Sequence, residues 1–233
     1  MGKLIPFLVT KLMNREKRPS LELPEVIKQR RAARAFKSDP IPEDILERIL
    51  HLGIQAPSGF NLQPWRFILI KSAENKAKLK ECAFNQRQIE EAPVVLICCG
   101  DRAAVSTENI EAVIRLGEEH QSMNEQYANY MRNTIPGFVE NSPSFGNQEV
   151  WTNRHTMLAV DHLMLVAKSY GVDSCPMEGF VTSQVKSAFN IPDTVDVCCL
   201  LPLGYAAEPD KNYGGRFDLS QVCYAESYGN KAF

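Results

Sequence analysis

A short stretch of this chain combines side chains that could hold a planar ligand with a backbone of restricted shape. The stretch Ala56–Trp65 carries Ser58, Asn61 and Gln63 among proline and glycine residues. Proline restricts φ, and glycine can adopt the unusual φ values that a tight connection requires. A connection with both residue types can therefore hold one compact shape. Its hydroxyl and amide groups can hydrogen-bond an amide-like ring. The alternative is a tight helix-to-strand turn without a ligand, because these residue types also dominate turns.

An arginine cluster upstream of this stretch could bind a phosphate. It consists of Arg30, Arg31 and Arg34. If a helix that starts near Pro24 continues through the cluster, Arg30 and Arg34 share one face at positions i and i+4. No acidic residue stands three or four positions from either, so both guanidinium groups lack local carboxylate partners. The alternative is a solvated basic face.

A second polar turn, Pro176-Met177-Glu178-Gly179, lies far downstream, and with the arginines it favours a ligand site at Ala56–Trp65 over a plain turn.

The sequence does not support a metal site, a serine-nucleophile site or a Rossmann dinucleotide site. His155 and His162 stand one heptad apart with no third residue at metal-ligand spacing, so no metal site is expected. The chain contains neither a G-x-S-x-G nucleophile elbow nor a G-x-G-x-x-G dinucleotide fingerprint.

Regular elements on either side must position these residues. A helix that begins near Pro42 and ends at Gly53 leads into the stretch Ala56–Trp65. The stretch Trp151–Tyr170 is apolar almost all round and predicts a helix at the centre of the protein. Three mostly apolar runs predict central strands of one sheet: Trp65–Ile70, Pro93–Gly100 and Val195–Leu203.

Residues 101–148 lose this clean pattern. We expect one long amphipathic helix over about Ile110–Met131, followed by a loop over Thr134–Gln148 that is rich in Pro, Gly and Asn. Long insertions often serve as lids or binding loops, and an ordinary helical hairpin is the alternative. Adaptable apolar side chains that could line a lid are Met123, Tyr127, Tyr130, Met131, Phe138 and Phe145.

We interpret residues 23–233 as one domain and residues 1–22 as an N-terminal arm. A length of 233 residues with 44% hydrophobic content suffices for one large domain. The apolar run Leu4–Val9 is too short to span a bilayer, and we expect the arm to pack on a partner subunit. The run Val222–Ala225 is strand-like but isolated, so it could join the sheet of another subunit.

Charge and cysteine usage narrow the setting. A net charge of -2 and a pI near 6.1 give no field that would draw the protein onto nucleic acid or an anionic membrane. The seven cysteines include Cys98-Cys99 and Cys198-Cys199, which stand in strand-like runs where thiols behave as small buried hydrophobes. No C-x-x-C pair occurs. We therefore expect a reducing, cytoplasmic setting.

The order and spacing of these motifs resemble the FMN-dependent nitroreductase family. The resemblance covers about Pro24–Gly229. It implies an α+β fold with a central mixed sheet flanked by helices, and an intertwined homodimer with C-terminal strand exchange and FMN in two interface clefts. The motifs are Arg30-Arg31-x-x-Arg34-x-Phe36, Ala56-Pro57-Ser58-x-x-Asn61-x-Gln63-Pro64-Trp65, Phe84-Asn85-x-Arg87, Pro176-x-Glu178-Gly179-Phe180, Leu203-Gly204-Tyr205 and Arg216.

The resemblance also implies roles for particular residues. Arg30, Arg31 and Arg216 would bind the phosphate and ribityl chain, and Arg34 would lie near the pyrimidine edge of the flavin. Asn85 would contact the ring, and the backbone of Glu178 and Gly179 would lie beside N5. The cofactor-binding set is therefore Arg30, Arg31, Arg34, Pro57, Ser58, Gly59, Asn61, Gln63, Asn85, Pro176, Glu178, Gly179 and Arg216, with Pro57, Ser58 and Gly59 supplied by the other subunit.

Some positions depart from the family pattern. Ala32 stands where many members have a phosphate-binding Ser, Gln88 where some have a Lys, and Gly214 where some have another Lys. Phosphate affinity and flavin tuning could therefore differ from those of other members.

The activity implied is hydride transfer from NAD(P)H through FMN to a flat electrophilic acceptor, such as a nitroaromatic or a quinone, in a ping-pong cycle. The cofactor carries this chemistry, so no catalytic side chain is expected. Two alternatives stay open. One is another reaction on the same fold, either flavin fragmentation in cobalamin-ligand synthesis or reductive dehalogenation of an aromatic. The other is a flavin-binding module without enzymatic activity.

Overall fold

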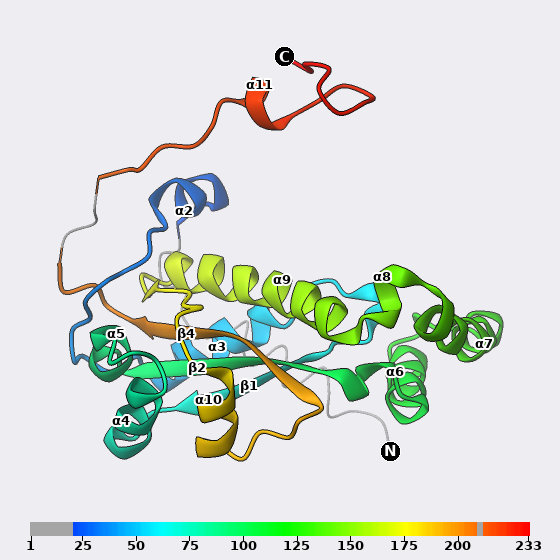
Figure 1. Cartoon of the computed structure of the whole chain (residues 1–233), viewed down its shortest axis with the longest axis horizontal. Helices are drawn as coiled ribbons and strands as arrows, with labels where there is room; N and C mark the ends of the chain where they lie inside the picture. Colours follow the sequence, from blue (N-terminus) through cyan, green and yellow to red (C-terminus); the bar gives the residue numbers. More distant parts are fainter. Residues whose placement is uncertain (1–20, 209–211) are drawn as a thin grey trace.

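A four-stranded sheet of order β1-β2-β4-β3 forms the middle of the protein (Figure 1). The structure, a computed structural model, describes residues 21–208 and 212–233. All pairings between its four strands are antiparallel, and an isolated bridge between Ala32 and Ser174 adds a parallel pairing. The predicted α+β class, with a sheet flanked by helices, is confirmed. The strands are β1 Trp65–Ile70, β2 Val94–Asp101, β3 Asp173–Ser174 and β4 Val195–Gly204.

Helices cover both faces of the sheet (Figure 1). They are α2 Leu23–Gln29, α3 Glu43–Gly53, α4 Ala73–Glu81, α5 Arg87–Glu91, α6 Thr107–Glu119, α7 Glu125–Asn141, α8 Pro143–Gly146, α9 Gln148–Ser169, α10 Thr182–Ala188 and α11 Leu219–Val222, with 3-10 turns η1 Gly59–Asn61 and η2 Arg102–Val105. Side chains alternate along β2, so Leu96 and Cys98 pack against α3 and α9 while Ile97 and Cys99 pack on the side of α4, α5 and α10. Two of the three predicted central strands, β2 and β4, do lie inside the sheet, but β1 lies at its edge.

The central helix α9 lies close against the sheet and against α3. A methyl group on Gly100 would lie 2.7 Å from Cβ of Thr152, and one on Gly53 would lie 2.6 Å from Cγ of Leu163. Only glycine allows backbones to approach this closely. The predicted helix over Trp151–Tyr170 is confirmed, and it ends where Gly171 adopts a φ of 75°.

The prediction for residues 101–148 is partly wrong. Two helices, α6 and α7, replace the single helix, because Gln121 adopts a φ of 56° and the side chain of Asn124 caps a new helix by accepting from the Tyr127 N–H at 2.8 Å. Helix α7 then continues through Pro136 to Asn141, where a loop was expected. Helices α6 and α7 correspond to the helical hairpin that was the alternative to a lid. That this hairpin acts as a lid is still a prediction.

The two ends of the chain also differ from expectation. The run Val222–Ala225 is not a strand: Val222 ends α11, whose first turn has a capping box formed by Asp218 and Gln221. The C-terminal segment passes α2 and extends away from the body of the molecule (Figure 1). The predicted N-terminal arm falls on residues 1–20, outside the described residues, apart from its last two positions. No helix within residues 21–208 or 212–233 is long and apolar enough to cross a membrane.

Candidate ligand-binding site

Three predicted arginines meet in one cavity of about 750 Å³ at the C-terminal half of α9. Helix α2 and the residues after it supply Lys28, Arg30 and Arg31, and the C-terminal segment supplies Arg216. Within the described part of the chain, Arg30, Arg31 and Arg216 form no ion pair with a carboxylate. The remaining lining residues are Ile27, Asp161, Leu165 and Tyr213. We call this cavity the arginine cleft.

Tyr213 joins the two segments that supply these cations. The guanidinium of Arg31 lies 4.8 Å from its ring centroid and that of Arg216 lies 5.7 Å away. Arg31 also donates from Nη1 to the carbonyls of Lys28 at 2.7 Å and Arg30 at 2.8 Å. Lys28 is ion-paired with Glu25 at 3.1 Å, so three guanidinium groups without a carboxylate partner among the described residues face the cleft together with one carboxylate, Asp161. The cleft therefore fits an anionic group such as a phosphate.

Sequence reasoning missed Lys28 and Tyr213. The position of Lys28 two residues before the arginines could have identified it. Nothing in the sequence pairs Tyr213 with Arg31, because their contact depends on the path of the C-terminal segment.

The prediction that Arg30 and Arg34 share one helix face is wrong. Helix α2 ends at Gln29, and Arg30 has an extended ψ of 125°. The following residues run beside β3, where the Ala33 N–H donates to the Ser174 carbonyl at 3.0 Å. Pairing with the sheet therefore replaces the helix, and Arg34 lies outside the lining of the arginine cleft.

Arg34 instead belongs to the neighbourhood of Cys175 and the predicted Pro176–Gly179 turn. Burial raises the pKa of the Cys175 thiol, and the nearby positive charge of Arg34 partly opposes that rise. The Arg34 carbonyl accepts from Nε of Arg87 at 3.1 Å. Met177 is fixed to β4 by reciprocal backbone hydrogen bonds with Leu200 at 2.8 and 2.9 Å. This turn is therefore held rigidly at the edge of the sheet.

The segment around Asn85 lies against the same turn. Nε2 of Gln86 donates to the carbonyl of Gly179 at 2.8 Å and to that of Ala83 at 3.2 Å. Phe84 and Asn85 adopt φ values of 54° and 56°, which exposes both side chains. Asn85, Glu178 and Gly179 are thus exposed on two adjacent turns, and the structure brings this predicted group together.

The stretch Pro57–Gln63 forms a strained loop. Phe60, Asn61 and Gln63 have φ values of 52°, 56° and 47°. Each such conformation costs about 1–3 kcal/mol in a residue other than glycine and persists only where the surroundings enforce it. Within the loop, the Gln63 N–H donates to Oγ of Ser58 at 2.9 Å, and Leu62 is completely buried. The loop therefore has a defined shape, as its composition predicted.

In one chain this loop lies away from the arginine cleft. Gly59 faces the start of α9, where a methyl group on it would lie 3.5 Å from Cζ2 of Trp151 and 3.6 Å from Nε2 of His155. The cleft instead contacts Asp161 and Leu165. His155 and Trp151 precede Asp161 by six and ten positions, which corresponds to about 9–15 Å of helix. The two predicted halves of the site thus occupy different parts of α9.

Aromatic side chains connect the loop to the helical hairpin. The ring of Phe60 lies 5.9 Å from Phe138 and 6.4 Å from Tyr130, centroid to centroid, and Phe145 lies 4.8 Å from Trp151. Of the side chains proposed for a lid, Met131 is fully buried in the core of the hairpin. Tyr127, Tyr130 and Phe138 have exposed fractions of 43%, 49% and 41%.

Within the described residues, no group of three or more His, Cys, Asp or Glu side chains is arranged to hold a metal ion.

Comparison with known proteins identifies the family of this chain. The model of the nitroreductase family matches residues 27–205. A Thermus thermophilus protein named NADH dehydrogenase is 31% identical over 190 residues, covering 82% of this chain and 89% of its own length. YodC of Bacillus subtilis, named as an NAD(P)H nitroreductase, is 31% identical over 199 residues, covering 85% and 96%.

Solved structures give the same result. A protein from Exiguobacterium sibiricum, described as a nitroreductase in complex with FMN, superposes with a TM-score of 0.82 at 28% identity and covers 91% of this chain and 100% of its own. The family match spans more than half of the chain, and the resemblance deduced from the motifs is confirmed. This protein belongs to the nitroreductase family and is an enzyme of that family.

Proposed function

We propose that the protein binds FMN in a site shared by two copies and catalyses hydride transfer from NAD(P)H to a flat electrophilic acceptor, such as a nitroaromatic or a quinone. The observation that carries this proposal is the arginine cleft, with Arg30, Arg31 and Arg216 around one cavity and without carboxylate partners among the described residues. The bound cofactor would supply the hydride chemistry. In the ping-pong order that we propose, NAD(P)H gives up its hydride and the oxidised nicotinamide, NAD(P)+, leaves the protein before the acceptor binds.

The donor set of the cleft fits the phosphate end of FMN. A phosphate monoester carries nearly two negative charges at neutral pH. Guanidinium groups bind it with two parallel N–H donors each, which also fixes its orientation. Tyr213 packs against Arg31 and Arg216, so the ribityl chain would pass a surface with both polar and apolar character.

The turns around Gly179 and Asn85 fit the ring. Both turns are exposed and lie next to each other. They offer backbone groups and the Asn85 amide to a ligand, and the hydrogen bond from Gln86 to the Gly179 carbonyl holds the two turns together. Arg34 adds a cation near Cys175, the residue before the Pro176–Gly179 turn. In this arrangement Asn85 and Gly179 orient the ring, and Arg34 stabilises negative charge on its edge. In our proposal, no side chain of the protein acts as a general acid or as a nucleophile.

A second copy would complete the site. The loop with Ser58, Asn61 and Gln63 contacts α9 about 9–15 Å along the helix from the arginine cleft, so in our proposal it serves the partner's flavin. Exposed apolar side chains support such a partner, because large exposed apolar surfaces mark interaction sites. They are Leu23 and Ile27 on α2, Val150 and Leu158 on α9, and Phe217, Leu219 and Val222 in the C-terminal segment.

Purified protein tests the proposal directly. We expect a yellow protein whose visible absorbance bleaches when NADH or NADPH is added without oxygen, and recovers when a nitroaromatic or a quinone is added. Initial rates at several acceptor concentrations should give parallel double-reciprocal lines. If the absorbance recovered with a halogenated aromatic but with no nitroaromatic or quinone, the result would favour reductive dehalogenation. Chemical breakdown of the flavin would favour flavin fragmentation. A protein that binds FMN but does not bleach would be a binding module, and one that binds no FMN would contradict the proposal.

A further inference from the structure

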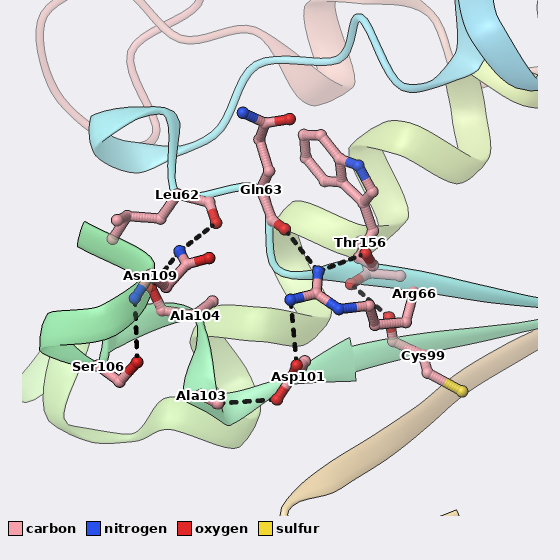
Figure 2. Close-up of polar contacts among 11 residues, drawn as sticks. Leu62, Gln63, Arg66, Cys99, Asp101, Ala103, Ala104, Ser106, Asn109 and Thr156 are labelled. Atoms are coloured by element: carbon pink, nitrogen blue, oxygen red, sulfur yellow. Dashed lines mark hydrogen bonds and ion pairs between the residues drawn. The ribbon is translucent and has the colours of Figure 1, made fainter. Parts of the chain in front are cut away.

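The four consecutive backbone carbonyls from Leu62 to Trp65 accept hydrogen bonds that fix the end of the strained loop. Figure 2 shows the bonds to the Leu62 and Gln63 carbonyls. The Leu62 carbonyl accepts from Nδ2 of Asn109 at 3.0 Å, and the Pro64 carbonyl accepts from the Asp101 N–H at 2.8 Å. The Gln63 and Trp65 carbonyls both accept from Nη1 of Arg66, at 3.0 and 2.9 Å. Every carbonyl from Leu62 to Trp65 therefore has a donor.

Arg66 is itself held in place. Its Nη2 lies 3.1 Å from Oδ2 of Asp101, and the other carboxylate oxygen of Asp101 accepts from the Ala103 N–H at 2.9 Å. The Asp101 side chain is only 17% exposed, whereas that of Arg66 is 47% exposed. A planar guanidinium with several fixed donors can satisfy two carbonyls and a carboxylate together. The end of β2 thus directs Arg66 onto the loop.

Asn109 connects the loop to the helical hairpin. It stands in the first turn of α6, which Ser106 caps. Its Nδ2 group donates to the Ala104 carbonyl at 2.8 Å as well as to Leu62, so both of its amide hydrogens are used. A movement of α6 would therefore either shift the Leu62 carbonyl or break its hydrogen bond with Asn109.

The loop needs such restraint because of its backbone. Phe60, Asn61 and Gln63 all adopt left-handed φ values. Hydrogen bonds inside the loop use the N–H groups of Asn61, Leu62 and Gln63 as donors, but they leave the carbonyls from Leu62 to Trp65 to partners beyond the loop. Left-handed residues other than glycine persist where surrounding contacts enforce them. Arg66 and Asn109 supply those contacts from outside the loop.

We infer that Arg66 and Asn109 are positioning residues: they fix the loop that presents Ser58 and Gln63 to the flavin, and Asn109 makes this presentation depend on the position of α6. The inference rests on the proposed function, because it takes the loop to face FMN. Neither side chain needs to touch the cofactor. Arg66 acts through the Gln63 and Trp65 carbonyls, and Asn109 acts through the Leu62 carbonyl.

The test compares Arg66→Met and Asn109→Asp with a matched control in the holoenzyme. Asn109→Asp keeps the shape of the side chain but replaces a donor by an acceptor. The control, Arg132→Met, removes an arginine whose Nε and Nη2 bind Glu111 at 2.6 and 2.8 Å on the same hairpin, away from the loop. Three quantities are measured: the FMN dissociation constant, the visible circular dichroism of bound FMN, and the thermal midpoint.

We expect both loop variants to raise the FMN dissociation constant about tenfold, the change that follows from losing one hydrogen bond to a charged or buried group. Their flavin dichroism should also change, whereas Arg132→Met should alter only the thermal midpoint. Arg66→Lys retains the charge and should recover part of the affinity, and it keeps the test available if Arg66→Met does not fold. Variants that match Arg132→Met in affinity and dichroism would overturn the inference while FMN binding by the parent protein stands. A parent protein that binds no FMN would overturn the proposed function itself.

Discussion

The guanidinium of Arg31 stacks over the ring of Tyr213, with 4.8 Å between the guanidinium carbon and the ring centroid. This contact connects the residues after α2 to the C-terminal segment and helps to form the arginine cleft. A cation–π contact at an exposed site contributes about 0.5–1 kcal/mol. We therefore expect Tyr213→Ala to raise the FMN dissociation constant about two- to fivefold, measured by quenching of flavin fluorescence. Tyr213→Phe keeps the ring and should bind like the parent; equal loss in both variants would show that the hydroxyl matters instead.

The cysteines should react slowly in the folded protein. Burial raises the pKa of Cys99 and of Cys198 to about 12, and it raises those of Cys82 and Cys175 as well. A raised pKa favours the neutral thiol, so the reactive thiolate is scarce at pH 8 and becomes common only as the pH approaches the raised value. All seven cysteines lie in the described residues, and six are buried while Cys223 is half-buried. A disulfide-exchange reagent should therefore modify one thiol quickly and all seven only after denaturation; two or more fast thiols would contradict this packing.

Sequence patterns predicted the parts of the fold that depend on burial. The apolar runs that became β2 and β4, and the almost fully apolar α9, are recognisable because nearly every position packs against something. The same reasoning placed β1 inside the sheet, yet Arg66 and Leu69 are exposed and β1 lies at the edge. The apolar composition of a strand does not determine how many neighbouring strands it has.

Local sequence patterns gave the wrong backbone conformation where a hydrogen bond to a residue far away in sequence determines that conformation. Arg30–Phe36 has a helical sequence, but its hydrogen bond to Ser174 makes it extended, and no local residue type indicates that bond. The boundary between α6 and α7 was locally encoded in Asn124, and it was missed because the amphipathic pattern continues across it. Within the candidate site, Arg30, Arg31 and Arg216 line one cavity as the family resemblance implied, whereas Arg34 and the loop lie elsewhere in the single chain. The contacts of Tyr213 and Asn109 join segments far apart in sequence, so no local pattern predicts them.

A shared site predicts complementation between two defective variants. In our proposal, Arg216→Ala damages the phosphate half and Ser58→Ala together with Gln63→Ala damages the loop half. A heterodimer of these two chains contains one site with all changes and one intact site. Co-expression should therefore yield heterodimers with about half the activity of the parent, although each variant alone is weak. Flavin-loaded monomer at micromolar concentration in sedimentation, or a heterodimer no better than its parents, would contradict the shared site.

The aromatic side chains of the hairpin should control which acceptors react. Tyr127, Tyr130 and Phe138 are exposed, and Phe60 links two of them to the loop. Alanine at these three positions should change the ranking of kcat/KM among nitroaromatic and quinone acceptors without loosening FMN. Met131 lies in the core of the hairpin, so Met131→Ala should instead cost about 2–5 kcal/mol of unfolding free energy. An unchanged ranking in the triple variant would rule out a role for this surface.

Arg34 and Arg30 should affect different properties of the flavin, because only Arg30 lines the arginine cleft. We place Arg34 beside the ring, where a fixed cation favours the more negative, reduced state of the cofactor over the oxidised state. A hydrogen bond to a charged group contributes about 1.5–3 kcal/mol, and 1.4 kcal/mol corresponds to about 30 mV for a two-electron couple. Arg34→Gln should thus lower the midpoint potential by some tens of millivolts in a spectroelectrochemical titration and slow reduction by NAD(P)H. Arg30→Ala should mainly weaken FMN binding, since a phosphate contact stabilises both redox states alike. An unchanged potential in the Arg34 variant, or an equal drop in the Arg30 variant, would mean that the two arginines bind opposite ends of the flavin from those assigned here.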